Sequence, residues 1–450
     1  MTYGATFVKK APTMKHENCT NPAPKQPWQV DDNIALECIP KEGWIREMVD
    51  YMIECTDAPV WFHLGAVLTT LSTAAGQAEL LITRQDDTTS RLGFQLWSVI
   101  IGQSGTRKSQ SSNIAVRILN NASMTNNNPS LILPADGSVE GLHDALAEEK
   151  RSGVGLYYPG ELRQLFDMYK RNYSKSMITW FLRTYERMPM DRALVKKKGE
   201  GTEKSASTDI ARLILTPSLS ILGTTPPTTL QNNTDKESWS SGFLPRFLFW
   251  GARRTKYMEL SGQILEREAI LCEWLKRIIV RQKPTIIIPY ELAQPILKWI
   301  RKNVEDKGVA AQPEIFSTLN RLQDKAFQIA GLMCIARHQS ICKGTIVVDE
   351  EDIKYAIRVL EAMYGTFWAL FTEVSGTPEG TQEKSLLRFL DDQPDCSRKE
   401  IGEALGDITP TTLYRMLRQL VQEGVIIEVK KARAGRGRRE SLYSLSKEPF

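Results

Sequence analysis

The sequence is poor in residues that bind transition metals, and it has no long apolar run. Its 450 residues include seven cysteines and four histidines, and no Cys-x-x-Cys pair occurs. We therefore expect no zinc site, and the odd, scattered thiols favour a reducing compartment, the cytoplasm. No apolar run approaches the roughly 20 residues of a membrane-spanning helix. The first residues carry lysines and prolines without the apolar centre of a secretory signal.

A strong charge of one sign is also absent. Lysine and arginine number 58 against 53 aspartates and glutamates, which gives a formal net charge of +5. Because this excess is small, the positions of the basic clusters say more about partners than the total does. One cluster, Lys196, Lys197 and Lys198, lies in a charged stretch before an apolar run. Such runs usually form solvated loops, and a DNA-contacting hairpin is the alternative.

The most informative stretch begins with the apolar run Leu96–Ile101, which leads into a glycine-rich turn and then into a Lys-Ser pair. A buried strand, a glycine-punctuated turn and a helix in this order predict a phosphate-binding loop. The glycines let backbone N–H groups converge on phosphate oxygens. Lys108 would reach the β- and γ-phosphates of ATP, and Ser109 would ligate Mg²⁺. The nucleotide-binding residues are predicted to be Gly102, Gln103, Ser104, Gly105, Thr106, Arg107, Lys108 and Ser109.

One residue of this loop departs from the usual pattern. Arg107 stands where a glycine normally precedes the lysine. Arg107 can adopt helical dihedrals, so we expect the loop to close with this side chain either turned away from the nucleotide or touching it. An ordinary strand–turn–helix with an exposed lysine is the alternative.

A second acid is needed to orient the attacking water. Glu161 follows the apolar run Val154–Tyr158 and is our candidate. Alternatively it is an exposed acid that complements a helix dipole. Gly160 occupies the preceding position, where an aspartate is usual, so Mg²⁺ would depend on Ser109, the phosphates and water.

Further polar residues follow two other apolar runs. Thr224 and Thr225 could sense the γ-phosphate or merely cap a turn. Arg246 is flanked by apolar residues, and an arginine held in this way usually has an anionic partner. That partner could be an internal glutamate or the γ-phosphate bound by a neighbouring subunit.

Apolar runs that alternate with helical stretches predict an α/β fold with a parallel sheet. Around it we expect a helical N-terminal cap, a helical C-terminal subdomain and a separate C-terminal unit. The predicted boundaries are a flexible arm at 1–40, a helical segment at 41–92, the phosphate-loop core at 93–260, the helical subdomain at 261–375, a linker at 375–380 and the last unit at 381–450.

The last unit has the pattern of a winged helix. Ser397 and Glu400 predict a capping box at its second helix. Its third helix should bury Leu413, Met416, Leu417 and Leu420. The opposite face would enter the major groove of DNA, with Thr411, Thr412, Arg415 and Arg418 exposed. The wing would contact phosphates through Lys430, Lys431, Arg433, Arg436, Arg438 and Arg439. Winged helices also bind proteins, which is the alternative.

Several motifs, in their order along the chain, resemble one family. They are Cys55-Thr56-Asp57-Ala58-Pro59, the phosphate loop, Asp136-Gly137-Ser138-Val139-Glu140-Gly141-Leu142, Tyr158-Pro159-Gly160-Glu161, the stretch 219–227 and the stretch 242–247. Over about residues 45–375 the chain is similar to the AAA+-like, primase-associated ATPases of phages, plasmids and integrated mobile elements. The resemblance implies a ring-forming ATPase of the P-loop (AAA+/RecA-like) class. It places Lys108 and Ser109 in the Walker A role, Glu161 in the Walker B role and Arg246 as a candidate arginine finger.

These observations together predict an ATP-dependent DNA helicase, translocase or remodelling ATPase that acts in the replication of a mobile genetic element. ATP and Mg²⁺ are the expected cofactors. The expected partners are single-stranded DNA in the ring of a homo-hexamer, duplex DNA at the winged helix, and a primase or another replication protein. The alternative is an ATP-gated DNA-binding switch or assembly factor with little hydrolysis, acting in replication initiation, transposition or defence.

Overall fold

The structure is a computed structural model of the chain. It describes residues 26–124, 130–163, 165, 175–191, 213–234, 242–255, 265–280, 285–305, 313–338, 344–374, 386–387, 389–390, 393–405, 408–422, 426–431 and 440–445.

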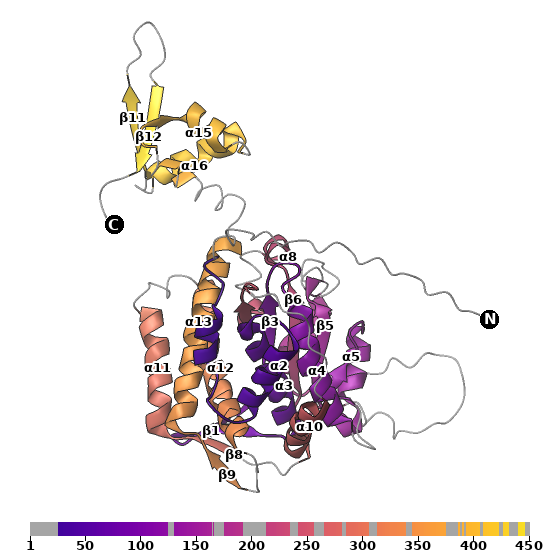
Figure 1. Ribbon diagram of the computed structural model, residues 1–450. Coiled ribbons are helices and arrows are strands. Elements are labelled where there is room, and N and C mark those ends of the chain that lie inside the picture. Colours follow the sequence, from indigo (N-terminus) through magenta and orange to yellow (C-terminus); the bar gives the residue numbers. More distant parts are fainter. Residues whose placement is uncertain are drawn as a thin grey trace, which may run out of the picture.

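A sheet of five parallel strands forms the centre (Figure 1), in the order β4-β5-β6-β3-β7. Strands β3, β6 and β7 are buried along their whole length. Parallel strands covered on both faces read as continuous apolar runs, which is why the sequence predicts them. The predicted α/β fold with a parallel sheet is confirmed. The strands are β3 Trp97–Ile101, β4 Ile132–Leu133, β5 Val154–Glu161, β6 Ser218–Thr225 and β7 Phe247–Gly251.

Helices cover both faces of this sheet. The ring of Trp97 on β3 packs on Phe181 of α7, with 6.1 Å between ring centroids. The next residue, Ser98, accepts a 2.7 Å hydrogen bond from Thr69 of α3. Because successive side chains of a strand point to opposite faces, α7 and α3 lie on opposite sides. The helices of this part are α1 Asp32–Glu37, α2 Trp44–Cys55, α3 Val60–Gln77, α4 Lys108–Ser123, α5 Val139–Leu146, α7 Lys175–Tyr185, α8 Pro227–Asn233, α10 Leu265–Ile279, α11 Tyr290–Glu305, α12 Pro313–Arg337 and α13 Glu350–Val374, with short 3₁₀ helices η1 Glu149–Arg151 and η4 Leu244–Arg246.

The segment before α2 differs from the flexible arm expected for 1–40. Trp28 and Ile39 are each 3% exposed, and the backbone N–H of Val30 donates a 2.8 Å hydrogen bond to the carbonyl of Gly251 at the end of β7. Burial of these apolar side chains holds residues 26–40 against the core. Residues 1–25 lie outside the described part of the chain.

A second sheet joins parts of the chain that are distant in sequence. Its order is β2-β1-β8-β9, and β1 runs parallel to β8. One hydrophobic cluster extends from Trp28 to Leu370. The units predicted at 41–92, 93–260 and 261–375 therefore share one core and do not pack separately. The strands of this sheet are β1 Leu81–Arg84, β2 Asp87–Gly93, β8 Thr285–Ile288 and β9 Thr345–Val347.

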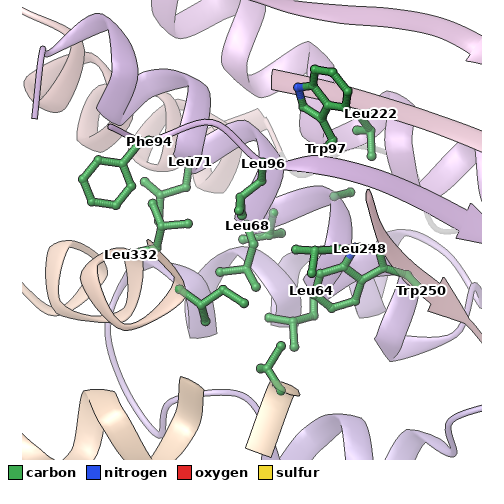
Figure 2. Close-up of a cluster of buried hydrophobic side chains, with 14 of the residues drawn as sticks. Leu64, Leu68, Leu71, Phe94, Leu96, Trp97, Leu222, Leu248, Trp250 and Leu332 are labelled. Atoms are coloured by element: carbon green, nitrogen blue, oxygen red, sulfur yellow. The ribbon is translucent and has the colours of Figure 1, made fainter. Parts of the chain in front are cut away.

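Helix α3 lies at the centre of this core. Figure 2 shows its side chains Leu64, Leu68 and Leu71 between the sheet residue Leu248 and Leu332 of α12. All five side chains are at most 1% exposed. The residues from Val60 to Gly76 are all buried because the helix is covered all round.

The C-terminal unit has a hydrophobic cluster of its own, which runs from Leu386 to Tyr443. It contains α15 Arg398–Leu405, α16 Pro410–Gln422 and an antiparallel sheet with the order β10-β12-β11. The four residues predicted to be buried on the third helix, α16, are each at most 6% exposed, which confirms its inward face. The strands are β10 Cys396–Ser397, β11 Ile426–Lys431 and β12 Glu440–Leu445.

The predicted capping box is present at α15. The backbone N–H of Ser397 donates to the Glu400 carboxylate at 2.7 Å, and the N–H of Glu400 donates to Ser397 Oγ at 3.3 Å. These two bonds satisfy donors that the first turn of a helix leaves without intrahelical partners.

Candidate functional site

The glycine-rich loop connects β3 to α4. Gly105 has a φ of +81°, which glycine adopts without a steric penalty. At Gly102 a Cβ would lie 2.7 Å from Thr106 Oγ1 and 2.8 Å from the Phe62 ring, so a larger residue does not fit without a shift. Thr106 Oγ1 donates a 2.7 Å hydrogen bond to the carbonyl of Gln103 and closes the turn. Both glycines are thus required by the conformation of the loop.

Arg107 does not have the helical dihedrals expected for it. Its φ is 62° and its ψ is 20°, in the left-handed region, immediately before α4 begins. The turn needs this conformation, which glycine supplies freely and which costs a residue with a Cβ roughly 1–2 kcal/mol. The Arg107 side chain lines the pocket beside the loop, and its Nε lies 3.4 Å from Oδ1 of Asp57.

Lys108 is buried at the start of α4. Its Nζ donates hydrogen bonds to the carbonyls of Gly102 at 2.7 Å and Gln103 at 2.8 Å. Burial lowers the pKa of this lysine, and the nearby Glu161 carboxylate acts in the opposite direction. A lysine that is 9% exposed and folded over its own loop contradicts the alternative of an ordinary turn with an exposed lysine.

Glu161 reaches the same place from strand β5. The pairing of β5 with β6 shifts between Tyr157 and Gly160, and Gly160 has a φ of +76°. Such a bulge re-aims the following side chain. Glu161 is thereby paired with Thr224, the penultimate residue of β6. Any L side chain is strained at the left-handed Gly160, so the aspartate that is usual at this position would be strained in the bulge.

One pocket brings most of these residues together. Its volume is about 420 Å³ and it lies beyond the carboxyl ends of β3, β5 and β6, the usual ligand position in open parallel sheets. Thr225 is not among the residues of its wall. The Thr225 hydroxyl donates to the carbonyl of Pro226 at 3.2 Å, as the turn-capping alternative expects. The lining residues are Ser104, Gly105, Thr106, Arg107, Lys108, Ser109, Gln110, Glu161, Thr224 and Pro226.

Two residues beside this pocket were not predicted as site residues. Arg254 follows the end of β7, forms an ion pair with Asp57 and donates a 3.3 Å hydrogen bond to the carbonyl of Gly105. The Asp57 side chain is fully buried beneath the loop. Asp57 belongs to one of the motifs that carry the family resemblance, so it could have been found from the sequence. Arg254 could not, because its place beside the loop depends on the pairing of β7 with β3.

Arg246 lies at the opposite end of the sheet. It precedes Phe247, which pairs with Trp97 at the start of β3, whereas the phosphate loop follows the end of β3. Its guanidinium forms an ion pair with Glu186 and stands over the Tyr185 ring, 5.2 Å from the centroid. The internal-glutamate alternative is therefore the correct one. This side chain is buried and paired within its own chain, so its position does not support the arginine-finger role.

The predicted DNA contacts are described only in part. On α16, Thr411, Arg415 and Arg418 are exposed, and Thr412 is half-buried with its hydroxyl 2.8 Å from that of Thr409. Several basic residues lie outside the described residues, namely Lys196, Lys197, Lys198, Arg433, Arg436, Arg438 and Arg439. Lys430 and Lys431 are described only as backbone of β11.

The donor set of the pocket fits a phosphorylated ligand. Lys108, Arg107 and the N-terminal end of α4 supply positive charge. The volume lies in the usual range for small-molecule sites, about 300–1,000 Å³. In the described part of the chain no group of three or more His, Cys, Asp and Glu side chains could hold a metal ion. The hydroxyl of Ser109 and the carboxylate of Glu161 are among the oxygen groups that line the pocket.

Comparison of the sequence with models of known protein families and with curated proteins finds no match. Among the described residues, no helix is both long and apolar enough to cross a membrane.

Proposed function

We propose that the chain is a Mg²⁺-dependent ATPase that acts on DNA as a helicase, translocase or remodelling enzyme. One observation carries the proposal: Lys108 and Ser109 at the start of α4 and Glu161 at the end of β5 converge on one pocket beyond the ends of neighbouring parallel strands. These are the groups that phosphate binding, metal binding and activation of water require.

Each residue has a defined task in this proposal. The loop N–H groups and the N-terminal end of α4 bind phosphate oxygens. Lys108 exchanges the carbonyls of Gly102 and Gln103 for the β- and γ-phosphates. Ser109 contributes its hydroxyl to Mg²⁺, which neutralises phosphate charge when bound. Glu161 orients the attacking water, and the Thr224 hydroxyl hydrogen-bonds that water or the γ-phosphate.

The arrangement of the strands supports a P-loop core of the AAA+/RecA-like kind. After β3 the chain crosses to β4 at the far edge of the sheet and returns through β5 and β6, and β7 then lies on the other side of β3. The direction of winding thus reverses beside β3, and ligands bind at such switch points. The phosphate loop stands at this position.

The C-terminal unit supports an interaction with duplex DNA. Its helices and its three-stranded antiparallel sheet are consistent with a winged helix, and α16 presents Thr411, Arg415 and Arg418 opposite its buried face. The remaining basic residues of the wing belong to the same proposal. Assembly into a hexameric ring and contact with a primase are proposed on the family resemblance alone.

A nucleotide-gated DNA-binding switch with little hydrolysis is the second candidate. Gly160 favours this candidate, because an aspartate at this position would help to hold Mg²⁺ for hydrolysis. The left-handed backbone of Gly160 is part of the bulge that aims Glu161.

Two measurements separate the candidates: phosphate release with and without single-stranded DNA, and displacement of a labelled strand from a duplex. A motor shows turnover that single-stranded DNA stimulates, together with strand displacement. ATP binding without turnover would establish the switch. Absence of ATP binding would refute both.

A further inference from the structure

Arg107 combines a strained backbone with a position on the pocket wall. It is the residue in the phosphate loop that adopts a left-handed conformation without being glycine. Strained residues persist where the surrounding structure or the function of a site requires them. Glycine would satisfy the backbone here, so the side chain is the part that calls for an explanation.

The guanidinium of Arg107 is held loosely. Its Nε lies 3.4 Å from Oδ1 of Asp57, within ion-pair range but beyond the usual length of a hydrogen bond. The buried Nε of Arg107 has no hydrogen-bond partner. Arg254 binds the other oxygen, Oδ2, more closely. The Asp57 carboxylate therefore keeps a cation when Arg107 moves away.

The two arginines also differ in their access to the pocket. The Arg107 side chain is 35% exposed and belongs to the pocket wall, next to Lys108. The Arg254 side chain is 13% exposed and is tied to the loop by its bond to the carbonyl of Gly105. The Arg107 side chain can therefore move away from Asp57, whereas Arg254 is held on Asp57.

We propose that Arg107 senses the terminal phosphate of a bound nucleoside triphosphate, exchanging the Asp57 carboxylate for γ-phosphate oxygens. Arg254 stays on Asp57 as a positioning residue and keeps the buried carboxylate neutralised. The planar guanidinium suits phosphate oxygens in this role. This inference rests on the proposed function of the same pocket. Its consequence is that Arg107 makes the site prefer triphosphate over diphosphate.

The test compares affinities of the full-length chain for ATPγS and ADP, each with Mg²⁺, in the wild type, Arg107→Gly and Arg107→Lys. Arg107→Gly removes the charge and relieves the backbone, so the protein stays folded. We expect the affinity for ATPγS to fall by about tenfold and that for ADP to change by less than about twofold, because one charge-assisted contact is lost. Arg107→Lys keeps the positive charge but loses the planar guanidinium, so its affinity for ATPγS should lie between those of the wild type and Arg107→Gly.

An unchanged ratio of the two affinities in Arg107→Gly would overturn the inference and leave the nucleotide site standing. A parallel Lys108→Ala variant identifies the other failure. If the wild type binds neither nucleotide, as Lys108→Ala is expected to do, the proposed function itself is refuted and this inference with it.

Discussion

At the scale of single residues, Glu161 is the acid that faces Lys108 across the pocket. If it activates the attacking water, Glu161→Gln should retain ATP binding and lose about 10²–10⁴ in turnover, because the amide cannot accept a proton. Single-turnover hydrolysis and filter binding of radiolabelled ATP measure the two effects. Wild-type turnover in this variant would leave Glu161 only the task of complementing a helix dipole.

His63 connects the stability of the core to pH. Its Nδ1 lies 2.9 Å from Ser111 Oγ on α4, and burial lowers the pKa of the histidine from 6.5 to about 3. Between these values the unfolded chain binds a proton that the folded chain does not. The free energy of unfolding should therefore fall on acidification below pH 6.5, by up to about 1.4 kcal/mol per pH unit.

Denaturant unfolding of the wild type and His63→Asn at several pH values between 7 and 5 checks this. Most carboxylates have pKa values below this window, so they contribute little to the slope. The variant should lose the part of the slope that comes from this proton. Equal slopes in both proteins would show that His63 accepts a proton in the folded state.

The residues of the pocket were predictable to different degrees. Lys108 and Ser109 begin the helix after β3, and Glu161 and Thr224 lie at the ends of β5 and β6. Their approximate places can therefore be inferred from the local pattern and from the rule that parallel strands end together. The left-handed Arg107 could not be inferred, because its conformation depends on closure of the whole loop.

At the scale of elements, the reciprocal hydrogen bonds at the start of α15 make a measurable contribution. Ser397→Ala removes one of them and should destabilise the C-terminal unit by about 1 kcal/mol, a typical value for a lost helix cap. The bond from the Ser397 N–H lowers the pKa of Glu400. The contribution of Glu400 is therefore present at neutral pH and is lost as the pH falls through the lowered pKa. Urea unfolding followed by circular dichroism checks the substitution, and an unchanged midpoint would contradict it.

The exposed face of α16 should contribute to binding of duplex DNA. Replacing both Arg415 and Arg418 with alanine should reduce the slope of log affinity against log salt by about two, since each phosphate contact contributes about 0.9. Arg277→Ala, an exposed arginine of α10, is the matched control. Fluorescence anisotropy at several salt concentrations gives the slopes. A slope that the double variant leaves unchanged would move α16 to a protein-binding role.

Elements differ in how well local pattern predicts them. The buried face of α16 follows directly from helical spacing, and the central strands from continuous apolar runs. The pairing of β1 with β8 joins residues about 200 positions apart, which no local pattern encodes. The segments 41–92, 93–260 and 261–375 contribute residues to one hydrophobic cluster.

At the scale of the whole molecule, the described residues form two hydrophobic clusters that share no residue. Separate cores unfold separately, so calorimetry of the full chain should resolve two transitions. Leu417→Ala, at a side chain 1% exposed, should destabilise the smaller unit by about 2–5 kcal/mol and leave the larger transition in place. A single transition that shifts as a whole would show that the two units are coupled.

Steady-state phosphate release from ATP, in wild type and Lys108→Ala, tests the central claim most directly. We expect the wild type to turn over ATP with Mg²⁺ and the variant to lose this activity, because Lys108 stabilises the charge that develops on the phosphates. The circular dichroism spectrum should stay the same, since Lys108 bonds carbonyls of its own loop. Turnover that is the same in both proteins would contradict the assignment of this pocket as the site of ATP hydrolysis.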